Sequence, residues 1–87
     1  MLTSSELCDE LHIARDILDR WVALGWVNPA TEDSSASYAD IDIARARLIL
    51  ELSTQFEVNE QGIGIIMNLI DQVHGLRFVL RQLIAMR

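Results

Sequence analysis

The apolar positions at the start of the chain predict two short helices joined by a tight turn. Thr3 can cap the first helix, and Glu6 stands where its side chain would complete a capping box. We expect this helix to bury Leu7, Cys8 and Leu11. After a turn at residues 12–13, apolar residues recur at helical spacing and predict one face of a second helix. These residues are Ile13, Ile17, Trp21 and Leu24. Two short helices connected in this way form a helix-turn-helix.

A small polar segment follows the second predicted helix. Gly25 can end that helix, and Trp26-Val27 is typical of a short extended piece before a turn at Asn28-Pro29. Residues 28–37 offer no side chain that could fill a core, so we expect a mobile loop there. Extended residues on both sides, at 26–27 and 36–38, would make this loop the tip of a small two-stranded wing.

The next apolar stretch predicts a third helix that runs from about residue 40 to Glu57. Asp40 can cap it, and Asp42 also suits the positive end of a helix. The residues that we expect this helix to bury are Ile41, Ala44, Leu48, Leu52 and Phe56. Val58-Asn59 breaks the pattern, and Asn59 can cap the last helix.

The last helix carries a heptad seam. Its apolar residues are spaced alternately by three and four positions, which is typical of a coiled coil. The seam consists of Ile66, Leu69, Val73, Leu76, Leu80 and Leu83. Because so small a chain has little else to cover this face, we expect a second copy to pack on it and form a homodimer. Gly75 allows a bend or a close helix crossing. The pattern leaves parallel and antiparallel pairing open.

These elements predict an all-α protein. Residues 1–58 would form a winged helix-turn-helix head, and residues 59–87 a C-terminal dimerisation helix, within a single compact domain overall.

Composition places the chain among small folded proteins. It has 87 residues, of which 51% are hydrophobic, with one proline and one cysteine. A single cysteine excludes an intrachain disulfide and a site with several thiolate ligands. No run approaches the roughly 18 unbroken apolar residues of a membrane span, and the N-terminus has no signal-peptide pattern. We therefore expect a soluble cytoplasmic protein without a membrane partner.

The formal charge of −6 is unevenly distributed. Residues 1–27 carry five acids and two arginines (−3), residues 28–60 carry seven and two (−5), and residues 61–87 carry one and three (+2). A DNA-binding head normally presents a basic surface, because neutralised phosphates supply much of its affinity. Here the head is the acidic part. The charge distribution therefore argues against nucleic-acid binding.

The chain offers no pattern typical of catalysis or metal binding. His12 and His74 each lack a second ligand at metal-binding spacing, and Cys8 has no basic neighbour in sequence to activate it. Asp40 and Asp42 are explained by the helix dipole. Nothing assembles a nucleophile, a base and an orienting group. We expect no enzyme activity, no cofactor and no metal.

The order of these elements resembles the MerR regulators. The segment Leu24-Gly25-Trp26-Val27-Asn28-Pro29, a loop and then Tyr38 before a capped helix carry this resemblance, together with the C-terminal coiled-coil helix. More closely, the chain is similar to the CbpM chaperone-modulator family. The residues that carry this narrower match are Ser5-Glu6-Leu7-Cys8, Leu24-Gly25, Tyr38-Ala39-Asp40, Gly62-Ile63, Leu69-Ile70-Asp71 and Leu76. The chain departs from the usual pattern at His12, Ala14 and Gly75.

The resemblance implies a dimeric protein that binds the J domain of a DnaJ-like co-chaperone and blocks its productive encounter with Hsp70, without a cofactor. J domains present a basic helix, so an acidic head would complement their charge. We predict that the contact uses Asp16, Asp19, Trp26 and Tyr38. An alternative for Trp26 and Tyr38 is that they close the small core.

Two other functions stay open at this point. The chain could be a divergent MerR-type DNA-binding regulator, although Ser37 stands before Tyr38 where such regulators typically have an arginine. It could also be a bare dimerisation module within a larger assembly.

Overall fold

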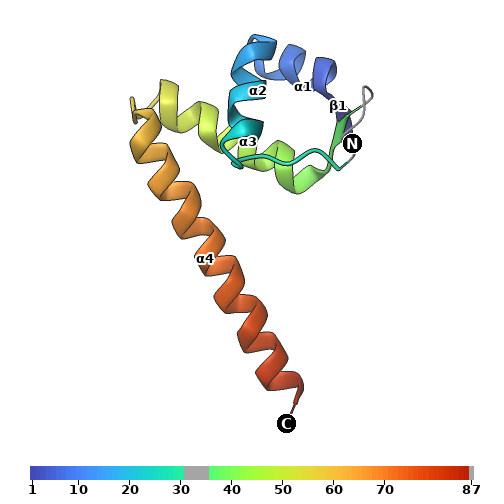
Figure 1. Ribbon diagram of the computed structural model, residues 1–87, viewed down its shortest axis with the longest axis vertical. Helices are drawn as coiled ribbons and strands as arrows, with labels where there is room; N and C mark the ends of the chain where they lie inside the picture. Colours follow the sequence, from blue (N-terminus) through green and yellow to red (C-terminus); the bar gives the residue numbers. More distant parts are fainter. Residues whose placement is uncertain (31–35, 87) are drawn as a thin grey trace. The chain divides into compact units, whose positions relative to one another are not determined.

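The computed structural model describes residues 1–30 and 36–86 (Figure 1). Four helices and two very short strands follow one another along the chain. They are β1 (Leu2–Thr3), α1 (Ser4–Leu11), α2 (Arg15–Ala23), β2 (Ser37–Tyr38), α3 (Asp40–Thr54) and α4 (Glu60–Ala85). The fold is therefore mostly helical, as the pattern predicted. The chain divides into two compact units, Met1–Glu57 and Val58–Arg87. The first unit is called the head below.

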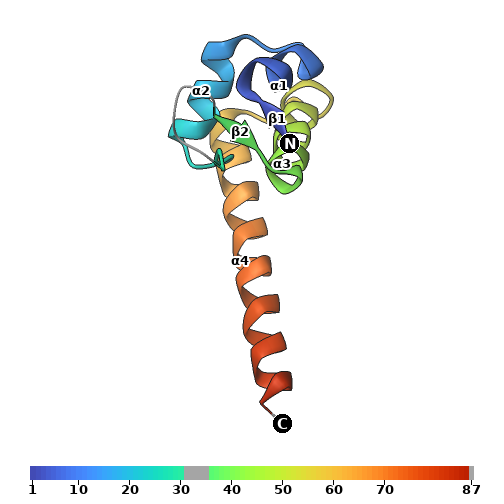
Figure 2. The ribbon, with the colours of Figure 1, turned by 90° about the vertical axis from the view of Figure 1, so that its right-hand side faces the viewer.

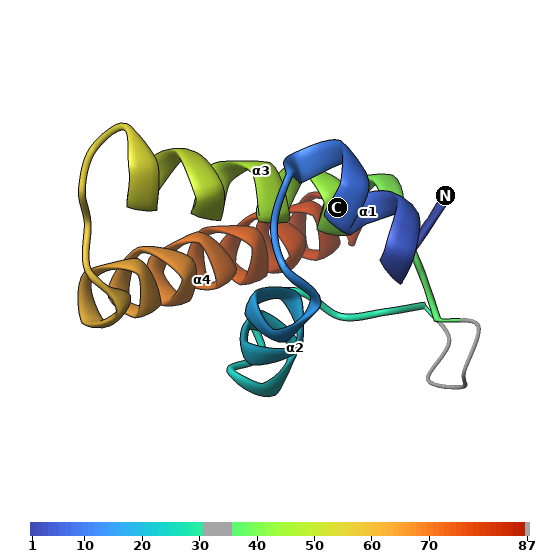
Figure 3. The ribbon, with the colours of Figure 1, turned by 90° about the horizontal axis from the view of Figure 1, so that it is seen from above.

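The helix-turn-helix consists of α1 and α2, joined by a short turn (Figure 3). The predicted capping box is confirmed: the Thr3 side chain accepts the Glu6 amide at 3.2 Å, and the Glu6 carboxylate accepts the Thr3 amide at 2.9 Å. His12 ends α1 in the left-handed conformation with φ 56°. Glycine is the residue that adopts this conformation most readily, so the turn keeps its shape although histidine occupies the position.

The apolar face predicted for α2 is partly wrong. Its buried residues are Leu18 and Trp21, whereas Ile17 and Leu24 are about two-fifths exposed, at 43% and 41%. A helix of nine residues has room for more than one apolar stripe, and contact with α1 selects the stripe that is buried. Gly25 does end this segment, with φ +79°.

The predicted pairing of the wing is also wrong. Trp26 and Val27 are buried and form no strand; the Trp26 amide donates to the Trp21 carbonyl and the Gly25 amide to the Val22 carbonyl, both at 3.0 Å, and these two bonds close the C-terminal end of α2. The partner of β2 is the N-terminal strand β1, in an antiparallel pair that joins Leu2 to Tyr38 (Figure 2). Strands of two residues are too short to leave a periodic pattern. Residues 31–35 of the predicted loop lie outside the described part of the chain.

The third helix begins and ends close to the predicted positions but buries a different face. Ala39, not Asp40, is its N-cap, and it ends at Thr54 rather than near Glu57. Its buried residues are Ile43, Ala46 and Ile49, while Ile41 and Phe56 are exposed at 59% and 68%. The predicted Ala44 is exposed, and Leu48 and Leu52 are half-buried. Because apolar residues surround α3, spacing alone could not select the face that packs on α1.

The hydroxyls of Ser53 and Thr54 both donate to the Leu50 carbonyl, at 3.0 and 2.7 Å. These bonds compete with the backbone ladder and favour an end to α3 at this point.

The head is organised around one apolar core. Its buried apolar residues come from α1, α2, β2 and α3 and from the turn after α2. They are Leu7, Cys8, Leu11, Leu18, Trp21, Trp26, Val27, Tyr38, Ile43, Ala46 and Ile49.

The C-terminal unit is the helix α4. The Asn59 side chain caps it, as predicted, by accepting the Gly62 amide at 2.8 Å. The absence of a side chain at position 62 matters, because a Cβ atom there would lie 2.7 Å from Cγ1 of Val58. The helix runs without interruption through Gly75, where an added Cβ would meet nothing within 4 Å.

Candidate functional site: an acidic helix face and an apolar seam

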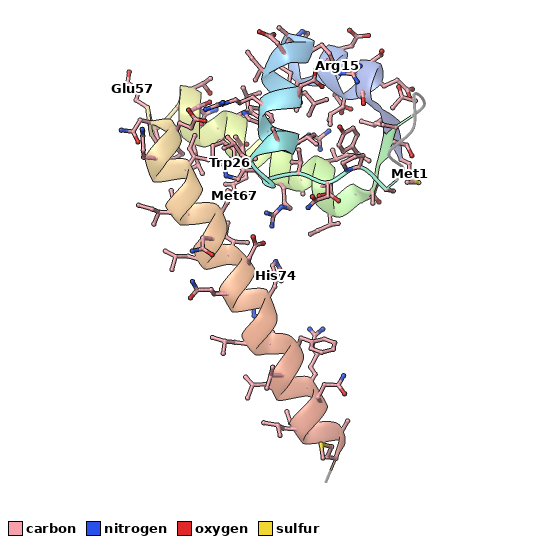
Figure 4. All side chains as sticks on the ribbon, in the orientation of Figure 1. Met1, Arg15, Trp26, Glu57, Met67 and His74 are labelled. Carbon is pink, nitrogen blue, oxygen red and sulfur yellow. The ribbon has the colours of Figure 1, made fainter. Side chains whose placement is uncertain are left out.

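The exposed side of α2 carries the carboxylates that the sequence analysis predicted as contact residues. Asp16 and Asp19 are three positions apart on one helix, so their side chains share a face, and both are exposed. Arg15, at the start of the helix (Figure 4), donates from Nε to Oδ1 of Asp19 at 3.0 Å. This hydrogen bond raises the pKa of the Arg15 guanidinium above its ordinary value, so the arginine stays charged.

Trp26 and Tyr38 do not belong to this exposed face. Only 8% of Trp26 and 3% of Tyr38 is exposed, so little of either ring is open to a partner. Their burial supports the alternative that both aromatic residues close the core. The sequence reasoning also missed Arg45, whose Nε donates to the Trp26 carbonyl at 2.7 Å. It named Asp42 only for its charge at the start of the third helix, and missed that its Oδ1 accepts the Asn28 amide at 3.0 Å.

These two bonds hold the turn after α2. Both partners come from α3, so α3 fixes the backbone on which Trp26 lies. No sequence pattern indicated them, because the partners are 19 and 14 positions apart.

The seam residues of α4 are mostly exposed. The exposed fractions are 54% for Leu69, 46% for Val73, 65% for Leu76, 57% for Leu80 and 56% for Leu83, and Ile66 is half-buried. The residues that α4 does bury, Ile63 and Met67, lie on another face, since successive helical residues are about 100° apart. The described chain therefore leaves a long apolar stripe open to solvent.

By length and composition, α4 could also cross a membrane. It has 26 residues, and an 18-residue segment within it has a mean hydropathy of 1.3 and is 11% buried. Its last half carries Arg77 and Arg81, and no acidic residue follows Asp71.

Within the described residues, the side chains assemble no group of three or more His, Cys, Asp or Glu that could hold a metal ion. Burial raises the pKa of the Cys8 thiol, so this buried side chain stays protonated at neutral pH.

Comparison with known families identifies the chain. Residues 2–84 match the family described as MerR HTH family regulatory protein. A search among curated proteins finds no significant match. The matched range contains the helix-turn-helix, both strands and nearly all of α4. The chain therefore belongs to the MerR helix-turn-helix family of regulatory proteins.

Proposed function

We propose that this chain is a cytoplasmic, non-catalytic chaperone modulator that binds the J domain of a DnaJ-like co-chaperone and inhibits its productive interaction with Hsp70. The observation that carries the proposal is the charge of the helix-turn-helix surface. In a DNA-binding member of the family, α2 would approach a polyanion; here that helix exposes Asp16 and Asp19. A partner with a basic helix fits this surface better than a nucleic acid does.

The local sequence supports the same choice of partner. Ser37 precedes Tyr38, so the described part of the wing offers no arginine that could anchor a phosphate before the aromatic ring. Because Trp26 and Tyr38 are buried, the contact that we propose is made by Asp16 and Asp19, with the two aromatic residues supporting the surface from within.

The proposal includes a homodimer through the seam of α4. The exposed stripe from Leu69 to Leu83 repeats with heptad spacing, which is the geometry that a second helix can cover. Two copies would present two heads, without a cofactor or a metal.

The alternative function is DNA binding by a divergent MerR-type regulator. Membership of the family favours it, together with Arg15 and Arg20 on α2. The two carboxylates on the same helix oppose it, because they would lie close to phosphates.

Calorimetric titration of a purified DnaJ-like J domain into the chain tests the proposal. We expect saturable binding that weakens by at least about tenfold in the double variant Asp16→Asn/Asp19→Asn, because buried or close charge pairs contribute strongly to an interface. Association should also slow as salt rises, since ions screen the attraction between the two surfaces.

The matched control is Glu51→Gln/Glu57→Gln, which removes the same charge from exposed positions outside α2. It should bind like the wild type. Equal loss in both double variants would show that net charge alone matters. Absence of J-domain binding, with sequence-specific binding to duplex DNA instead, would replace the proposal by the alternative.

A further inference from the structure

Two apolar side chains on the surface of α2 have no role in the proposed function. The spacing of Ile13, Ile17, Trp21 and Leu24 predicted one buried face, but only Trp21 of this set is fully buried. Ile17 is 43% exposed. Leu24, the last residue of the helical turn with φ −79°, is 41% exposed. The structure therefore leaves part of this predicted face open to solvent.

The two side chains lie on one face of the helix. They are seven positions apart, and Arg20 stands between them, three positions after Ile17 and four before Leu24. Residues at this spacing are neighbours on a helix surface, and such a row is what one helix presents to another. The hydrocarbon stem of an arginine adds apolar surface to such a row. Ile17, Arg20 and Leu24 are called the α2 stripe below.

Neither the helix nor the core of the head requires an apolar stripe at this place. Isoleucine is β-branched and is a poorer helix former than alanine, lysine or arginine. The side of α2 that faces the core already contributes Leu18 and Trp21, which are 0% and 7% exposed. A partner that removed the remaining surface of Ile17 and Leu24 from water would gain free energy from both.

Charge beside the stripe restricts the partner. Asp16 lies four positions before Arg20, and Asp19 lies three positions after Asp16, so the acidic face borders the stripe on one side. Arg15 binds Asp19 at 3.0 Å and offsets part of its charge. The attraction between charges therefore orients a partner more than it holds it, and the apolar stripe is the better source of affinity.

We propose that the α2 stripe anchors the partner by packing against one amphipathic helix, whose apolar face has basic residues along the edge that meets Asp16. This inference rests on the proposed function, because the J domain supplies that helix. Apolar anchors at the centre of an interface typically contribute most of its binding free energy, while charges at the rim determine orientation.

Calorimetric titration of a purified DnaJ-like J domain into the full chain tests the anchor through the double variant Ile17→Ala/Leu24→Ala. We expect the affinity to fall by at least about tenfold, because truncation of a buried anchor has an effect of this order. The heat-capacity change of binding should become less negative, since less apolar surface is buried. The loss should be equal at low and high salt, whereas the loss in Asp16→Asn/Asp19→Asn should shrink as salt rises.

Ile41→Ala is the matched control, because it truncates an apolar residue of α3 that is 59% exposed. It should bind like the wild type. Far-ultraviolet circular dichroism verifies that each variant is folded. A measurement on the wild type needs no variant: the methyl groups of Ile17 and Leu24 should show nuclear Overhauser contacts with the J domain.

The outcomes separate this inference from the proposed function. If the wild type does not bind a J domain, both fail. If the wild type binds and Ile17→Ala/Leu24→Ala binds equally well, the α2 stripe is not the anchor, although the proposed function stands. Sedimentation adds a third outcome: dissociation of a wild-type dimer by the same double variant would assign the stripe to a second copy of the chain and overturn the inference.

Discussion

At the residue scale, Thr3 and Glu6 determine where the first helix begins. Each side chain binds the backbone amide of the other residue, so two amides that the helix leaves without an internal partner are satisfied together. The hydrogen bond from the Thr3 amide, aided by the Thr3 side chain, lowers the pKa of the Glu6 carboxyl below its ordinary value of 4.5. Folding therefore favours the ionised form of Glu6.

The variant Glu6→Gln tests this coupling, since glutamine can still accept the Thr3 amide but does not titrate. The folded-state pKa of Glu6 is depressed, so its stabilisation is present above the unfolded-state value and is lost as pH falls through the folded-state value. We expect the wild type to be more stable than Glu6→Gln at neutral pH, with the difference shrinking as pH falls below the ordinary carboxyl range. Urea denaturation between neutral and acidic pH measures it. A difference that does not change with pH would contradict the argument.

At the element scale, two glycines have opposite roles. Gly25 follows α2 with φ +79°, a conformation that residues with a Cβ atom rarely adopt. Gly75 lies in the interior of α4, where an added methyl group would meet nothing within 4 Å. The first glycine is required by the turn that places Trp26 in the core, whereas the second only weakens a helix.

Gly25→Ala and Gly75→Ala therefore form a matched pair. We expect the first to lower the free energy of unfolding by about 1 kcal/mol, because alanine is strained in the left-handed region. We expect the second to stabilise α4 by about 1 kcal/mol, because alanine is a much better helix former than glycine. Thermal unfolding followed by circular dichroism compares the two. Destabilisation by both substitutions would show that Gly75 has a contact in solution that the single chain lacks.

At the scale of the whole molecule, the chain joins an acidic head to a helix with an open apolar face. The head has one apolar core, although Ile17, Ile41 and Phe56 remain exposed, while most seam residues of α4 are about half exposed. A stripe of this length is rarely left in water by a soluble protein. A second helix and a lipid bilayer are both apolar surroundings that could cover it, and the heptad spacing favours the second helix.

Sedimentation of the wild type and of Leu76→Asp distinguishes these surroundings. We expect a wild-type dimer and a monomeric variant, because each carboxylate would be buried against apolar side chains in the seam. Gln72→Asp, on the same helix but outside the seam, is the control and should stay dimeric. A monomeric wild type that floats with lipid vesicles would instead assign the stripe to a membrane.

Local sequence signals determined several of the helix ends and the family resemblance. The capping box at Thr3, the turn at Gly25 and the cap at Asn59 all lie where the pattern predicted, since each depends on residues only a few positions apart. The acidic residues of α2 were also identified in advance, because a nine-residue helix with so many charges must expose most of them.

Only the tertiary structure decided which apolar residues are buried and which strands pair. Packing in the head buries Ile43, Ala46 and Ile49 rather than the face predicted for α3. Trp26 and Tyr38 are also buried in the core of the head. The tertiary structure also paired β2 with the N-terminal strand. These outcomes depend on contacts between segments distant in sequence. Local spacing does not indicate the buried face of a helix that is apolar on several sides. It also does not indicate the partner of a strand of two residues.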